Sequence, residues 1–145
     1  MKALLFKIYA SLLLPVFVFF MPIYIMVFLV GLSTLVDTGF GIWRAKAMGE
    51  PVDSKKCRHG LIPKIRSYVI IILILYVADF YIVNEFTKLF ISIDFVSTKL
   101  VSLALIVIEV KSMDESFKAV KGYSFIEKLY SNIKGFKKVK NDLEP

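Results

Sequence analysis

Residues 8–36 read IYASLLLPVFVFFMPIYIMVFLVGLSTLV, without a single charged side chain. A helix needs about 20 apolar residues to cross the hydrocarbon core of a bilayer, because it rises only about 1.5 Å per residue. The run is longer than this minimum and would not stay in solution as an exposed helix. It therefore predicts an integral membrane protein.

The composition of the whole chain favours the same class. Hydrophobic residues make up 57% of the 145 residues, and the mean hydropathy is +0.70, well above that of ordinary soluble proteins. The net charge of +7 could suit nucleic acid. However, the basic residues flank the apolar blocks, where the positive-inside rule and anionic lipid headgroups place them. We therefore expect the lipid bilayer, with its anionic headgroups, as a partner, and no nucleic acid.

The first apolar block allows two layouts, because Pro15 and Pro22 interrupt it and proline removes a helix hydrogen bond. In one layout the chain reverses near Pro22, and residues 3–20 form an extra span. In the other, the first residues lie along the interface and one span covers 15–39. Either way the block exceeds the core of a signal peptide, about 7–15 residues, so we expect it to be retained.

The remainder of the chain alternates between basic and apolar segments. Residues 44–64 are rich in lysine and arginine and predict a cytoplasmic loop. Residues 65–84 and 89–108 predict two further spans, which form a hairpin through the membrane. The lysine-rich tail, 111–145, carries apolar residues at helical spacing and predicts an amphipathic cytoplasmic helix, broken near Gly122.

The predicted fold is therefore an all-α integral membrane protein. It has three transmembrane helices, or four if residues 3–20 also span, plus the amphipathic C-terminal helix. The charge distribution predicts a multi-pass membrane protein with a cytoplasmic C-terminus.

Catalytic and metal-binding arrangements are scarce in this sequence. Cys57 is the only cysteine and His59 the only histidine, and the spacing of the two does not match a metal site. No nucleophile–base pair or phosphate-binding loop can be assembled. We therefore expect no enzyme activity, no catalytic residue, no cofactor and no metal.

Small and polar residues gather where the first span ends. Small side chains let helix backbones approach closely in lipid, where packing drives association. Asp37 has two interpretations: a helix end at the interface, or a polar contact between helices, with Ser33 and Gly41 on the same face at i−4 and i+4. The predicted set for helix packing and oligomerisation is Ser33, Asp37, Thr38, Gly39 and Gly41.

A second polar set lies deeper in the apolar blocks. An intramembrane acid such as Asp79 costs about 2.5–3.5 kcal/mol on insertion scales, so it either has a partner or lies near the outer headgroups. Thr98, Ser102 and Glu109 share one helical face at i, i+4 and i+11, which Ser112 and Ser116 continue. A polar stripe on a membrane helix favours a protein partner or a water-filled lumen. The predicted lumen or interhelix residues are Asp79, Thr98, Ser102, Glu109 and Ser112.

Several short motifs, in their order and spacing, resemble one known family. The chain carries Asp37-Thr38-Gly39, Trp43, Ala45, Ser54-Lys55-Lys56, Gly60-Leu61, Lys64-Ile65, and later Leu105-Ile106-Val107-Ile108-Glu109-Val110-Lys111-Ser112 with Glu115-Ser116. Together they resemble the phage holin family of the toxin-secretion and phage-lysis type, as found in phages and prophages of Bacteroides-like bacteria. The resemblance covers roughly residues 25–130. The family often has asparagine where Ser116 stands.

The resemblance implies a small pore-forming protein. Such holins form homo-oligomers in the bacterial inner membrane and open lesions that release or activate an endolysin, their functional partner in host lysis. In this interpretation Asp37, Gly39 and Gly41 serve packing, while Thr98, Ser102 and Glu109 face the lumen. The alternative is a non-lytic helical membrane scaffold, an antiholin or an accessory subunit of a membrane complex.

Overall fold

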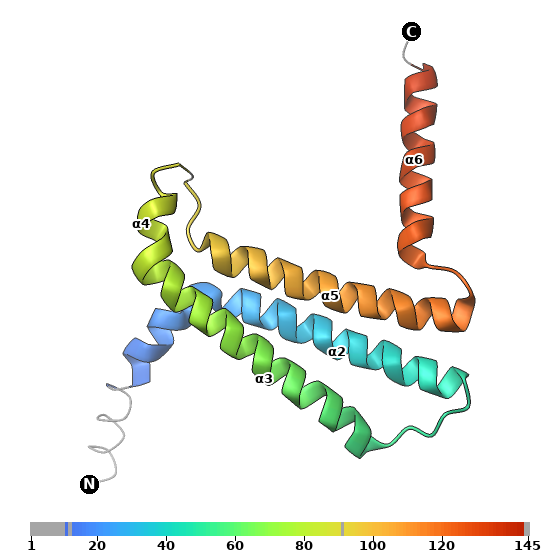
Figure 1. Ribbon diagram of the computed structural model, residues 1–145, viewed down its shortest axis with the longest axis horizontal. Helices are drawn as coiled ribbons and strands as arrows, with labels where there is room; N and C mark the ends of the chain where they lie inside the picture. Colours follow the sequence, from blue (N-terminus) through green and yellow to red (C-terminus); the bar gives the residue numbers. More distant parts are fainter. Residues whose placement is uncertain (1–10, 12, 91, 144–145) are drawn as a thin grey trace.

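Every regular element in the described part of the chain is helical, as Figure 1 shows. The computed structural model describes residue 11, residues 13–90 and residues 92–143. A helical segment over 13–20 and the short 3₁₀ turn η1 (Met21–Ile23) lead into the main helices. These elements are α2 (Tyr24–Ala47), α3 (Ser54–Ala78), the π-helical turn η2 (Asp79–Val83), α4 (Asn84–Thr87), α5 (Val96–Lys121) and α6 (Phe125–Leu143).

Helices α2, α3 and α5 form the body of the molecule. Figure 1 shows α3 running antiparallel to α2 and α5 running parallel to it, while α6 projects away from the bundle at the end of α5. The apolar core between them is small: it consists of Ile23, Val30, Ile72, Tyr76 and Leu105. The Tyr76 hydroxyl donates a hydrogen bond to the carbonyl of Phe19, which ties the N-terminal segment to α3.

The polarity of the bundle is inverted relative to a water-soluble protein. Large apolar side chains lie on the outside, with Phe17 72%, Ile74 63% and Leu100 61% exposed. Polar side chains lie inside, and Asp79 and Glu109 are fully buried. A water-soluble domain shows the opposite preference, because burying a polar group without compensation is costly. The exterior of the bundle therefore suits an apolar surrounding.

Two helices in the described part of the chain are long and apolar enough to cross a membrane. They are Leu13–Ala47 and Cys57–Thr87. The predicted all-helical class is thus confirmed, and so are two candidate spans. The third span, over 89–108, stays a prediction. Residues 3–10 and 12 of the possible additional span lie outside the described part of the chain.

The chain does not reverse at Pro22, which corrects the hairpin layout. Helix continues through the turn Met21–Ile23 into α2. Pro22 lies in the first turn of η1, where it has no N–H to donate to the preceding helical turn, and a proline at such a point bends a helix. Figure 1 shows a bend at this point instead of a turn back.

The expected loop over 44–64 is mostly helical. Helix α2 continues to Ala47, and α3 already begins at Ser54, so only residues 48–53 connect them. The carboxylate of Asp53 accepts a hydrogen bond from the backbone N–H of Lys55 at 2.9 Å, which caps the first turn of α3. The cytoplasmic position of the segment stays a prediction. Its local structure differs from a loop because the Asp53 cap starts α3 before the apolar block begins.

The segment expected to span over 89–108 also differs from the structure. Its helix, α5, begins only at Val96, after Phe95 adopts a left-handed conformation with φ of 58°. At the other end α5 continues past residue 110 to Lys121, so the expected tail boundary at 111 is not a break. The helix ends at Gly122, as predicted, where φ is 79° and the backbone N–H bonds the carbonyl of Lys118.

A compact hydrogen-bonded corner sets the direction of α6. The Asp114 carboxylate accepts bonds from the Ser124 hydroxyl at 2.6 Å and from the backbone N–H groups of Phe125 and Ile126 at 2.8 and 3.2 Å. Burial by itself raises the pKa of Asp114, but these hydrogen bonds and the nearby charge of Lys118 outweigh it and hold the pKa below its usual value.

The corner should therefore weaken in acid. Because the pKa of Asp114 is lowered by folding, its contribution is present above the ordinary pKa of about 4 and is lost as pH falls through the folded pKa. We expect the wild type to exceed Asp114→Asn in free energy of unfolding by about 1 kcal/mol at pH 7. Chemical unfolding in detergent should show this difference shrinking below about pH 4. Glu115→Gln is the matched control, and an unchanged difference at low pH would contradict the assignment.

Candidate functional site

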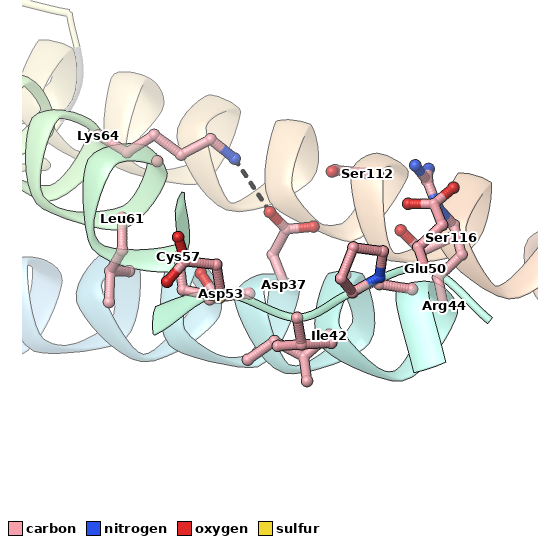
Figure 2. A pocket seen from close by; sticks show the side chains of 16 residues that line it. Asp37, Ile42, Arg44, Glu50, Asp53, Cys57, Leu61, Lys64, Ser112 and Ser116 are labelled. Atoms are coloured by element: carbon pink, nitrogen blue, oxygen red, sulfur yellow. Dashed lines mark hydrogen bonds and ion pairs between the residues drawn. The ribbon is translucent and has the colours of Figure 1, made fainter. Parts of the chain in front are cut away.

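Three helices meet at one ammonium group. Nζ of Lys64, on α3, lies 2.9 Å from Oδ2 of Asp37 on α2 and 3.1 Å from Oε2 of Glu109 on α5. Figure 2 shows the Lys64 side chain reaching toward Asp37. One helical turn further along α3, the Tyr68 hydroxyl donates to Oε1 of Glu109 at 2.6 Å. We call Asp37, Lys64, Tyr68 and Glu109 the polar junction.

The electrostatics of the polar junction favour a closed arrangement of helices. The side chain of Glu109 is fully buried, that of Asp37 is 11% exposed and that of Lys64 is 40% exposed. The carboxylates of Asp37 and Glu109 face one ammonium group, and the Tyr68 hydroxyl donates a further hydrogen bond to Glu109. A buried charge is tolerated only when it is paired and hydrogen-bonded. The carboxylates of α2 and α5 therefore both depend on α3 for their partners.

A cavity of about 350 Å³ adjoins the polar junction. Its wall comes from the end of α2, the connector 48–53, the start of α3 and the last third of α5, as Figure 2 shows. Ser112 and Ser116 of α5 line it together with Asp37 and Lys64. The described residues contain no group of three or more His, Cys, Asp or Glu side chains that could hold a metal ion. The cavity thus offers polar contacts around an ion pair.

The predicted packing set on α2 is only partly used within one chain. Asp37 is buried in the polar junction, while the hydroxyls of Ser33 and Thr38 bond carbonyls of their own helix, those of Val30 and Thr34. The face that α2 buries carries Val30, Thr34 and Asp37, rather than the predicted row of Ser33, Asp37 and Gly41.

The two glycines of the set have room around them. A Cβ atom added at Gly39 or Gly41 would meet nothing within 4 Å apart from its own helix and neighbours. These glycines therefore do not provide a close helix approach inside a single chain. Their role in packing between copies stays a prediction.

The polar set of α5 lies on its inner face. Thr98 and Glu109 are fully buried and Ser102 is 4% exposed, all on the side that faces α2 and α3, while Ser112 lines the cavity. The spacing of i, i+4 and i+11 thus does place these groups on one face. In a single chain they contact neighbouring helices, and a lumen-lining role stays a prediction.

Asp79 caps α5 from a neighbouring helix. Its Oδ2 accepts bonds from the backbone N–H of Thr98 at 2.7 Å and from the Thr98 hydroxyl at 2.6 Å. Thr98 is in the first turn of α5, where backbone N–H groups have no intrahelical acceptor and the helix dipole favours negative charge. The sequence left two alternatives for Asp79, a polar partner or a place near the outer headgroups. The structure gives Asp79 a partner within the chain, the first turn of α5.

The π-helical turn η2 supports this cap. A π turn pairs residues i and i+5, and the backbone N–H of Asn84 bonds the carbonyl of Asp79. Oδ1 of Asn84 in turn accepts a bond from the backbone N–H of Phe95 at 3.0 Å. Asp79 and Asn84 thus hold the start of α5 together.

Sequence reasoning missed Lys64 and Tyr68 as partners. Lys64 was assigned to the basic segment and Tyr68 to the lipid-facing block. One signal was available: two acids inside or beside apolar blocks require a cation, and Lys64 lies at the edge of the second block with Tyr68 four residues later. Which helix supplies that cation depends on tertiary packing.

Removal of the shared ammonium should destabilise the bundle. We expect Lys64→Met to lower the free energy of unfolding by about 2–3 kcal/mol, below the range for a fully buried pair because Lys64 is partly exposed. A triple variant, with Asp37→Asn and Glu109→Gln added, should recover most of the loss, because no buried charge then lacks a partner. Titration with a denaturing detergent measures both, with Lys55→Met as the exposed control on α3. A triple variant no more stable than the single one would contradict this interpretation.

The cap by Asp79 yields a separate prediction. Asp79→Leu leaves the Thr98 N–H and hydroxyl without their acceptor and should cost about 1–3 kcal/mol, whereas Asp79→Asn keeps an acceptor oxygen and should cost less. The same detergent titration measures the order of the two variants. Asp94→Leu is the control, because the Lys88–Asp94 ion pair is exposed and should contribute little. Equal stability of Asp79→Leu and the wild type would rule out the cap.

Comparison with known proteins finds no matching family model, no similar curated protein and no similar solved structure. The resemblance to holins therefore stays a prediction from the short motifs of the sequence. Arguments about function rest on the polarity and contacts of the bundle itself.

Proposed function

We propose that this chain is a holin-type protein of the bacterial inner membrane that oligomerises and opens lesions through which an endolysin passes. The observation that carries the proposal is the inverted polarity of the bundle. Apolar side chains cover α2 and α3 on the outside, whereas a set of polar groups that includes Asp37, Asp79 and Glu109 is buried between the helices. Such a bundle suits lipid, because lipid tails are as apolar as the exposed side chains and solvate them, whereas water would not.

The pore-forming step depends on α5. This helix buries a row of polar groups that includes Thr98, Ser102, Glu109 and Ser116. We propose that in the oligomer α5 turns this row toward a water-filled lumen, with Ser112 beside it. The Lys64 bridge to Asp37 and Glu109 would then stabilise the closed subunit before assembly, because α5 must leave it to open.

The alternative is a non-lytic membrane scaffold, an antiholin or an accessory subunit. One observation favours it: the polar junction pairs its charges within a single chain. A protein that keeps this arrangement in its working state has no polar face left for a lumen. The two functions differ in whether the protein alone permeabilises a membrane.

Inducible expression in bacteria separates these functions. A holin should collapse the membrane potential at a reproducible time and should lyse the cells when an endolysin is supplied in the cytoplasm. A potential-sensitive dye and culture turbidity measure the two effects, and membrane fractionation confirms the amount of protein. Normal growth and an intact potential at high levels of membrane-located protein would reject the holin proposal and favour the scaffold.

Substitution of Gly39 tests association between copies. Because nothing lies near its Cβ position, Gly39→Leu should leave the single chain folded and should delay lysis if this face packs against another copy. Gly60→Leu, the same change at an equally open helical glycine of α3, is the matched control. Turbidity after induction gives the delay. Lysis of both variants on the wild-type schedule would remove Gly39 from the association face.

A further inference from the structure

Helix α6 has an apolar face that no other part of the described chain covers. Ile126, Leu129, Tyr130 and Ile133 are 39%, 60%, 69% and 54% exposed. They follow the spacing i, i+3, i+4 and i+7, which places them on one side of the helix. The polar residues Lys128, Ser131 and Lys134 lie away from this stripe. An exposed helix with such a division suits the boundary between water and an apolar phase.

The direction of α6 fits a membrane surface. Figure 1 shows α6 beside the end of α5, steeply inclined to the long helices and projecting away from the bundle. At this end of the bundle α2 and α5 finish and α3 begins. If Leu13–Ala47 and Cys57–Thr87 cross a bilayer, this end lies at one of its surfaces, and a helix that lies across their axes lies along that surface. The Asp114 corner fixes this direction through three hydrogen bonds.

The charge at this end indicates the kind of lipid. Arg44 and Lys46 are in the last turn of α2, and Lys118 and Lys121 are in the last turn of α5. Lysines flanking an apolar stripe can extend to the headgroups while the stripe enters the acyl region. Basic residues near a bilayer surface each contribute about 1 kcal/mol when the lipids are anionic.

We propose that α6 is a membrane-surface helix that binds anionic lipid, with Ile126, Leu129, Tyr130 and Ile133 inserted below the headgroups and the Asp114 corner as its positioning element. This inference rests on the membrane location in the proposed function, but not on pore formation. The occupant of the apolar stripe is the bilayer itself, since α6 begins at the end of the bundle where α2 finishes and α3 begins, and the last turns of α2 and α5 there are basic.

The test uses the full chain with Cys57→Ser and one new cysteine that carries an environment-sensitive fluorophore. Ile133→Cys reports on the apolar stripe, Ser131→Cys on the opposite side, and Ile74→Cys on the exposed side of α3. The proteins are reconstituted into phosphatidylcholine vesicles with or without phosphatidylglycerol. Quenching by brominated acyl chains reports contact with lipid, and quenching by iodide reports contact with water.

We expect the label at 133 to be quenched by brominated lipid, at least twofold more with phosphatidylglycerol, and the label at 131 to be quenched by iodide. Iodide quenching at both positions would overturn the proposal. A shielded label at 133 that brominated lipid does not quench would also overturn it, because α6 would then contact protein. Equal quenching with and without phosphatidylglycerol would overturn the anionic preference.

The label at 74 separates the two levels of inference. If brominated lipid quenches 74 but not 133, the chain is membrane-embedded and only the proposal for α6 fails. If it quenches neither, the membrane location fails as well. Asp114→Ala should reduce the difference between 131 and 133 while the signal at 74 persists, whereas Glu115→Ala should not. An unchanged difference in Asp114→Ala would remove the corner as positioning element.

Discussion

The arrangement of the three long helices depends on the ammonium group of Lys64. It is the cation that the structure places between a carboxylate of α2 and a carboxylate of α5. In an apolar surrounding an unpaired carboxylate is costly, so this pairing constrains the helices more than their small apolar core does. Apolar contacts between lipid-exposed helices are replaceable by lipid, whereas the charge pairing is specific to one arrangement.

Helix α5 is fixed at two points along its length. Asp79 binds the first turn through Thr98, and the polar junction binds Glu109 three turns later. Two polar anchors on one face set both the rotation and the register of the helix. The opposite face carries Leu103 and Val107, 58% exposed each. A pore in which α5 lines a lumen therefore requires both anchors to exchange their partners, which makes the closed bundle a stable starting state for the proposed function.

Sequence periodicity predicted the helical class and the two longest apolar segments, because these depend on local composition. It also placed Thr98, Ser102 and Glu109 on a single face of one helix. The helix boundaries were less predictable, because they depend on side-chain acceptors. Helix α3 begins at Ser54, where Asp53 supplies the acceptor. Helix α5 begins at Val96, where Asp79 and Asn84 supply acceptors from an earlier part of the chain. The partner of Asp37 was not predictable, because Lys64 is distant in the sequence and its basic neighbours suggested a loop.

The accessibility of α5 in a bilayer tests the inverted polarity most directly. Spin labels placed one at a time from Val101 to Val110, with Cys57→Ser, would be measured by electron paramagnetic resonance for collisions with oxygen, which enters lipid, and with a water-soluble nickel complex. We expect oxygen collisions to peak at 103 and 107 and to be lowest at 102, 105 and 109, with little access for nickel. A uniform profile, or nickel access highest at 103 and 107, would contradict a bundle whose apolar side faces lipid.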